Sequence, residues 1–232
     1  MEAIVLAGGF GTRLSTIVQD VPKPMAPVAG RPFLEYILDD LVDHGITRVV
    51  LAVHYKKECI MEHFESCYRG VEVLYSIEDM PLFTGGAVKK ALRQCKDPYV
   101  FVVNGDTYFE VPLSKMAEEA QQSGKPVTIA VKQMTNFSRY GRVAVDSNHV
   151  VTAFHEKQPC EIGLINGGIY YLSREILEPY PEKFSMEVDC FPTLLQYGGI
   201  AAFESQGYFI DIGVPEDFYA AQDYFLEGKL DE

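Results

Sequence analysis

The sequence predicts an α/β fold with a Rossmann-like, mostly parallel central sheet, helices on both faces and a smaller sheet in the C-terminal half. In the first half of the chain, short β-branched runs alternate with helical patterns, which is typical of repeated βαβ units. In the second half, strand-like runs follow one another with short turns. No Gly/Ser-rich or charged linker interrupts the 232 residues. We therefore expect one domain over residues 1–232.

Four strands of the central sheet are expected in the first half. They cover residues 2–7, 48–53, 71–77 and 99–103. Between the first two, apolar residues recur at helical spacing, namely Leu34, Ile37, Leu38 and Leu41. Gly45 supplies a stop signal. The pattern predicts an amphipathic helix packed on the sheet.

Several strands of the second half could pair antiparallel. Its strand-like runs cover residues 127–131, 142–145, 150–154 and 165–172. A helix over residues 186–196, a strand near residues 200–203 and a last helix from Pro215 complete the prediction. Proline at that point suits the first turn of a helix.

The composition limits the classes of partner. A net charge of −13 argues against binding to nucleic acid or to a membrane surface, because both need a basic face. Small anionic substrates stay possible, since a few cations, helix N-termini and a divalent metal can hold them. The N-terminal residues carry no basic leader, and no apolar run reaches the roughly 20 residues of a membrane span. We expect a soluble, cytoplasmic protein with reduced cysteines.

A glycine-rich loop over residues 8–14 follows the first predicted strand. Glycines let backbone amides approach an anion closely, although such turns are also common as purely structural features. The loop lacks the ending of a P-loop, and Leu14 stands where the dinucleotide fingerprint needs glycine. Arg13 in the loop and Lys23, fixed between two prolines, could supply positive charge to a transferring phosphate. The loop therefore favours phosphate binding.

Two aspartates follow predicted strands. Asp106 lies just beyond residues 99–103, and Asp211 ends the run Phe209-Ile210 before a glycine. Open α/β sheets bind ligands at the carboxyl ends of their strands. A cap or turn aspartate is the alternative interpretation.

Residues 8–14, followed by Pro22-Lys23-Pro24-Met25, closely resemble the signature of the sugar-1-phosphate nucleotidyltransferase family. Gly105-Asp106 and residues 211–217 are similar to two further family motifs. The resemblance implies transfer of a nucleotidyl group from a nucleoside triphosphate to a sugar 1-phosphate, with Asp106 and Asp211 as Mg²⁺ ligands. Two carboxylates with waters and phosphate oxygens suit that ion. The family resemblance also implies catalytic roles for Arg13, Lys23, Asp106 and Asp211. It further implies that the nucleotide is bound by Leu6, Gly8, Gly9, Gly11, Thr12, Arg13 and Gly86.

The resemblance also implies a sugar-phosphate site. Glu156 would accept hydrogen bonds from the sugar hydroxyls, and Lys157 would contact the phosphate of the sugar. An exposed ion pair at a strand end is the simpler interpretation of these two residues. Gly141 and Asn166 lie in segments similar to those that line the sugar in the family. Residues 1–110 would mainly bind nucleotide, and residues 111–232 mainly the sugar phosphate.

The segment over residues 81–87 resembles the base-reading stretch of the family, but Phe83 occupies a usual glycine position. Phe83 either stacks on a purine or reshapes the backbone. Gly86 is expected to open a helix over residues 87–92 beside the base.

Residues 22–28 and 183–189 most resemble the heptose 1-phosphate guanylyltransferases of the family. This resemblance implies GTP and D-glycero-α-D-manno-heptose 1-phosphate as substrates, with a product used for surface polysaccharide. Mannose 1-phosphate guanylyl transfer and N-acetylmuramate 1-phosphate uridylyl transfer are alternatives within the family. A non-catalytic subunit that binds nucleotide sugar is the alternative of another class. The sequence is compatible with a homo-oligomer.

Overall fold

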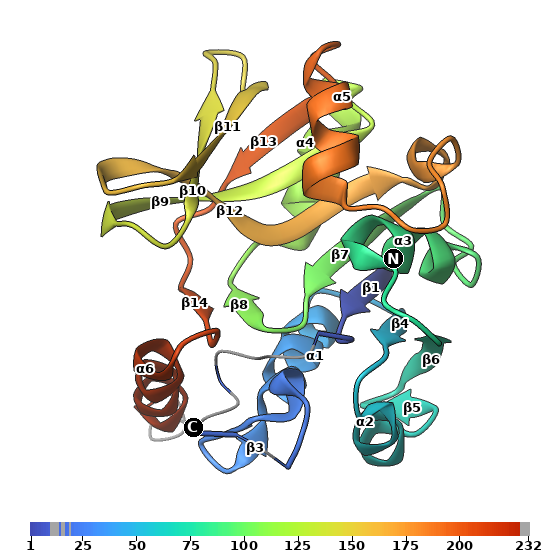
Figure 1. The fold of residues 1–232 in the computed structure, drawn as a ribbon. Helices are drawn as coiled ribbons and strands as arrows, with labels where there is room; N and C mark the ends of the chain where they lie inside the picture. Colours follow the sequence, from blue (N-terminus) through green and yellow to red (C-terminus); the bar gives the residue numbers. More distant parts are fainter. Residues whose placement is uncertain (10–13, 15–16, 19, 228–232) are drawn as a thin grey trace.

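A large mixed sheet organises the fold (Figure 1). The computed structural model describes residues 1–9, 14, 17–18 and 20–227. In this part of the chain, ten strands form one sheet, and two small sheets have two strands each. The centre of the large sheet is parallel, in the order β7-β1-β4-β6. These strands are β1 (Glu2–Leu6), β4 (Arg48–Val53), β6 (Val71–Ile77) and β7 (Tyr99–Asn104). The predicted fold class is confirmed.

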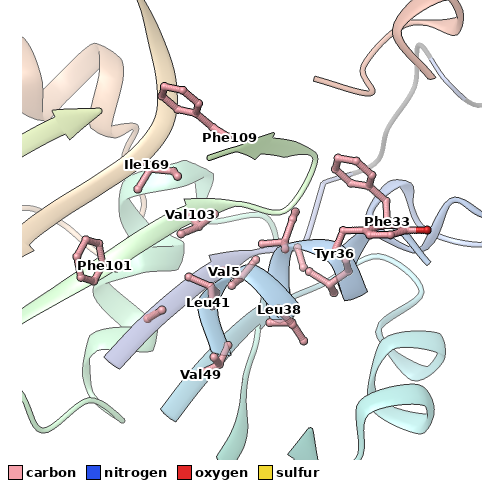
Figure 2. Packing of buried hydrophobic residues seen from close by; sticks show 14 of the residues in the cluster. Val5, Phe33, Tyr36, Leu38, Leu41, Val49, Phe101, Val103, Phe109 and Ile169 are labelled. Atoms are coloured by element: carbon pink, nitrogen blue, oxygen red, sulfur yellow. The ribbon is translucent and has the colours of Figure 1, made fainter. Parts of the chain in front are cut away.

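The parallel strands are apolar on both faces because helices cover both faces. On one face, Val5 and Val49 belong to a buried cluster with residues of α1 (Phe33–Asp43), shown in Figure 2. On the other face, Ile4 and Val50 belong to a cluster with residues of α3 (Phe83–Leu92). Side chains alternate along each strand, so neighbouring residues contribute to different clusters.

Antiparallel strands extend the same sheet into the C-terminal half. β12 (Cys160–Ser173) pairs with β7, and β10 (Gly141–Val145) and β11 (Val151–Lys157) follow it outward. β9 (Val127–Phe137) also pairs with β12. The predicted antiparallel pairing is confirmed for these strands, and β13 (Ile200–Glu204), for which no direction was predicted, runs parallel to β9.

The remaining elements connect or cover the sheet. The helical ones are η1 (Lys23–Met25), α2 (Lys57–Phe64), α4 (Leu113–Ser123), η2 (Arg174–Leu177), η3 (Met186–Cys190), α5 (Phe191–Leu195) and α6 (Pro215–Glu227). The short strands are β2 (Pro27–Val28), β3 (Arg31–Pro32), β5 (Cys67–Tyr68), β8 (Thr107–Phe109) and β14 (Phe209–Asp211). In the described part of the chain, no helix is long and apolar enough to cross a membrane.

The helix predicted over residues 186–196 is divided in two. Met186–Cys190 forms a π-helical turn, in which the N–H of Phe191 donates to the carbonyl of Met186, and α5 follows. Pro192 lacks an N–H, so the ordinary bond to the carbonyl of Val188 cannot form. The π-helical turn ends two residues before this proline.

The helix expected to begin after Gly86 begins earlier, at Phe83, so that prediction of the boundary was wrong. Gly86 lies inside α3, where its N–H donates to the carbonyl of Phe184 at 3.1 Å. A Cβ on Gly86 would lie 2.3 Å from the carbonyl oxygen of Glu182. Glycine at this position therefore permits close packing of the helix on the chain at residues 182–184.

This packing predicts the effect of Gly86→Ala on stability. The added methyl group meets backbone, which cannot rotate away, so the free energy of unfolding is expected to fall by about 1–3 kcal/mol. Urea denaturation measures this change. Gly9→Ala is the control, because no described atom lies within 4 Å of an ideal Cβ there. Equal midpoints for Gly86→Ala and wild type would contradict the packing role.

Candidate active site

The carboxyl ends of the parallel strands surround a cavity of about 320 Å³. Strands β1, β4, β6 and β7 all end at this edge of the sheet, as ligand-binding edges of open α/β sheets do. The residues on its wall come from these strand ends and from the start of α3. They are Leu6, Gly8, Gly9, Ala52, His54, Glu78, Pro81, Leu82, Phe83, Thr84, Ala87, Asn104 and Asp106.

The structure places part of the predicted phosphate loop on this cavity. Gly8 and Gly9 line it together with Leu6. A Cβ on Gly8 would lie 3.3 Å from the backbone nitrogen of His54, so the first glycine allows the loop to pass close to β4. Gly11, Thr12 and Arg13 lie outside the described residues, and their roles stay predictions. Gly86 does not contribute to the described wall, for the packing reason given above.

Lys23 lies between the two predicted metal-binding aspartates. Its Nζ donates to Asp106 Oδ2 at 2.6 Å and to Asp211 Oδ1 at 3.3 Å. The three residues come from η1, the turn after β7 and the end of β14. β14 pairs with β8, and this register sets Asp211 opposite Thr107, the residue after Asp106. Folding thus unites charges that are 83 and 188 residues apart along the chain.

The charges in this group oppose one another. Burial raises the pKa of Asp211 above its ordinary value, the Lys23 ammonium lowers it, and the Asp106 carboxylate raises it again. The N–H of Gly213 donates to Asp211 Oδ1 at 2.8 Å and also favours the ionised form. Two carboxylates that share one cation form a site in which positive charge is required.

A second cavity of about 410 Å³ lies on the C-terminal side of this group. All four residues predicted to bind the sugar phosphate line it: Gly141, Glu156, Lys157 and Asn166. Asn104 lines both cavities, Asp106 lines the first and Asp211 lines the second. The Lys23 group therefore lies where the two cavities meet.

Two of the predicted sugar-site residues also have structural tasks. A Cβ on Gly141 would lie 2.6 Å from the carbonyl oxygen of His155, so glycine permits the contact between β10 and β11. Asn166 donates through Nδ2 to the hydroxyl of Tyr170 at 2.8 Å and accepts from the N–H of Gly168 at 3.0 Å. The register of β12 against β9 shifts between Asn166 and Tyr170, which forms a bulge on the cavity wall.

Glu78 is a cavity residue that sequence reasoning missed. It follows β6, is only 6% exposed, and accepts from the N–H of Leu82 through Oε2 at 2.9 Å. Burial raises the pKa of Glu78, and the hydrogen bond from Leu82 opposes that shift. Its place directly after a predicted parallel strand is the signal that could have found it.

Glu187 was also missed as a cavity residue, although it lies in the segment 183–189 that resembles the heptose 1-phosphate guanylyltransferases. Its Oε2 accepts from the hydroxyls of Thr84 at 2.6 Å and Ser185 at 2.8 Å, and Glu187 lines the second cavity. Thr84 lines the first cavity. Glu187 therefore links the walls of the two cavities.

The described residues fit a divalent metal through two protein ligands at most. They contain no group of three or more His, Cys, Asp or Glu side chains arranged around a metal position. Asp106 and Asp211 nevertheless converge on a single cationic group, and carboxylate oxygens suit Mg²⁺, which keeps several waters or phosphate oxygens.

Comparison with known proteins gives consistent results. The nucleotidyl transferase family matches residues 2–228 of the chain. D-glycero-alpha-D-manno-heptose 1-phosphate guanylyltransferase from Campylobacter jejuni is 46% identical over 94% of this chain and 97% of its own length. The protein of the same name from Aneurinibacillus thermoaerophilus is 44% identical over 96% and 97% of the two chains. The crystal structure of HddC from Yersinia pseudotuberculosis complexed with GMP-PN is 37% identical, with a TM-score of 0.88 over 97% of this chain and 99% of that one.

The Lys23 group predicts a pH-dependent loss of stability in Lys23→Met. Without the ammonium the two carboxylates repel each other, and the free energy of unfolding should fall by about 1–3 kcal/mol near pH 8. The folded-state pKa of Asp211 is raised by burial, so protonation favours the folded state and the loss should shrink as the pH falls. Urea denaturation in EDTA, which keeps metals from replacing the ammonium, measures both effects.

Lys115→Met is the matched control, because that side chain is 66% exposed and its ion pair with Glu119 contributes little. A loss in Lys23→Met that stays constant with pH would contradict the proposed repulsion.

Proposed function

Because the chain belongs to the nucleotidyl transferase family, we propose that it transfers a guanylyl group from GTP to D-glycero-α-D-manno-heptose 1-phosphate and releases pyrophosphate. The observation that carries this proposal is the meeting of two cavities at Lys23, Asp106 and Asp211. The choice of substrates rests on the names of the curated relatives.

The two cavities suit two substrates. The first is lined by residues up to Asp106, and the second almost entirely by later residues. This supports nucleotide binding by residues 1–110 and sugar-phosphate binding by residues 111–232. The α-phosphate would lie at the junction, where the phosphate of the sugar can reach it from the opposite side.

In the reaction, an oxygen of the sugar phosphate attacks the α-phosphorus of GTP in line. A new phosphorus–oxygen bond forms, the bond to the bridging oxygen of the β-phosphate breaks, and pyrophosphate leaves with its electron pair. The attacking phosphate is already mostly ionised near neutral pH, so no general base is required. Lys23 stabilises negative charge that gathers on the α-phosphate.

Asp106 and Asp211 are the residues that would hold Mg²⁺, as their convergence on Lys23 supports. Bound there, the ion would neutralise charge on the phosphates. In the second cavity, Glu156 would accept hydrogen bonds from hydroxyls of the heptose, and Lys157 would contact its phosphate.

Glu78 supports the choice of a guanine base. Its Oε2 accepts from the N–H of Leu82, and its Oε1 lies 3.4 Å from an ideal Cβ on Gly8, another residue of the cavity wall. An ionised carboxylate only accepts hydrogen bonds. Guanine presents N–H donors on its base-pairing edge, so this carboxylate is complementary to guanine.

A matrix of nucleoside triphosphates against sugar 1-phosphates, scored by pyrophosphate release, tests the proposed function. GTP with the heptose phosphate is expected to give the highest kcat/KM. A higher kcat/KM for GTP with mannose 1-phosphate, or for UTP with N-acetylmuramate 1-phosphate, would contradict the proposed substrates and identify that pair instead. Absence of release with every pair would favour a non-catalytic subunit.

Removal of either aspartate is expected to abolish most of the activity. Asp106→Asn and Asp211→Asn should each lower kcat by about 10²- to 10³-fold in saturating Mg²⁺, because charge stabilisation at the phosphates is lost. EDTA should likewise stop the wild-type reaction, and added Mg²⁺ should restore it. Glu216→Gln, a change to an exposed carboxylate nearby, serves as the control. Near-normal turnover in either aspartate variant would refute this assignment.

Substitution of Glu78 is expected to weaken the binding of GTP. Glu78→Gln should raise KM for GTP about ten-fold or more, the usual effect of losing a hydrogen bond to a charged group. Since burial raises the pKa of Glu78, ionisation on raising the pH should lower KM for GTP in the wild type.

That pH trend should disappear in Glu78→Gln and persist in Asp79→Asn, whose side chain is exposed. The comparison uses initial rates at saturating sugar phosphate. An unchanged KM for GTP in Glu78→Gln would exclude Glu78 from base recognition.

A further inference from the structure

Phe83 adopts a backbone conformation that favours glycine. Its φ is +60°, in the left-handed region, where the side chain of an L-residue is strained. Of the seven described non-glycine residues with positive φ, Phe83 is the one on the wall of the 320 Å³ cavity. The position where the family usually has glycine thus keeps a glycine-like backbone while it carries an aromatic ring. This observation argues against a reshaped backbone.

The ring gains little from the fold in return for this strain. Phe83 is 58% exposed, so burial offsets only part of the cost of placing it there. The ammonium of Lys183 lies 4.9 Å from the ring centroid. Such a contact orients an exposed ring, although it stabilises the fold only slightly. Strain and exposure at one residue on a cavity wall point to a ligand that the ring contacts.

The surroundings of Phe83 define the chemistry of that ligand. The ring shares the cavity wall with the carboxylate of Glu78 and the side chains of Pro81 and Leu82. A flat ligand with hydrogen-bond donors on its edge matches this combination of an aromatic face and an acceptor. Gly8 and Gly9, which are predicted to bind phosphate, lie on the same wall.

We propose that Phe83 is a specificity-determining residue that stacks on the purine base of the nucleoside triphosphate. The proposal rests on the proposed function only in that the cavity beside Gly8 binds the nucleotide. Aromatic stacking acts on the base and not on the phosphates, and it is stronger for a purine than for a pyrimidine because the overlapping surface is larger.

Calorimetric titration of the whole protein in magnesium buffer, without sugar phosphate, tests the proposal with GTP, UTP and inorganic tripolyphosphate. Phe83→Gly removes the ring and keeps the backbone conformation accessible. It is expected to weaken GTP binding about ten-fold, to weaken UTP binding less, and to leave tripolyphosphate binding unchanged. Phe83→Tyr should bind GTP as the wild type does.

Thermal unfolding of the variants supplies a matched check on the backbone. Phe83→Ala and Phe83→Gly both lack the ring, but only alanine keeps the strain. The midpoint for Phe83→Gly should be about 2–4 °C above that for Phe83→Ala, while both variants lose GTP affinity equally.

Unchanged GTP affinity in Phe83→Gly, or an equal loss for tripolyphosphate, would overturn the stacking role. The two proposals fail separately. If the wild type transferred guanylyl and Phe83→Gly still bound GTP tightly, only the stacking role would fall. If Phe83→Gly lost GTP affinity while the wild type transferred nothing, only the proposed function would fall.

Discussion

Two like charges held beside one cation are the constraint on which the rest of the site depends. Asp106 and Asp211 both contact Lys23, and burial of Asp211 makes its ionised form costly without that ammonium. The fold meets this requirement by fixing Lys23 between Pro22 and Pro24 in a short helical turn. The junction of the two cavities is consequently a place where positive charge is needed before any substrate arrives.

The continuous sheet holds the two cavities at a fixed separation. β12 pairs with β7, whose end leads into the first cavity, and with β10, which contributes to the wall of the second. Gly168 approaches so closely that a Cβ there would lie 2.7 Å from Asn104 Nδ2, and Asn104 lines both cavities. These hydrogen-bonded strands connect the walls of the two cavities directly.

Glycines that look alike in the sequence have different tasks in the structure. Gly8 passes close to β4 and lines the first cavity, whereas Gly86 lets α3 pack against the carbonyl of Glu182. Phe83 shows the converse case, a bulky residue that keeps the conformation of a glycine. A motif therefore indicates that a backbone position is special, but the neighbours in space decide whether a ligand or another segment is the reason.

The sequence by itself determined the α/β class, the parallel strands and α1, and its resemblance to family motifs singled out Lys23, Asp106 and Asp211. Periodicity, strand ends and spaced motifs are local properties, so they can be recognised from the amino-acid sequence alone. Only the tertiary structure decided that Lys23 lies between the aspartates, that Glu187 accepts from Thr84, and that Gly86 supports packing. Each of these depends on contacts between residues about 80 to 190 apart in the chain, whose proximity follows from sheet order and register and not from local sequence.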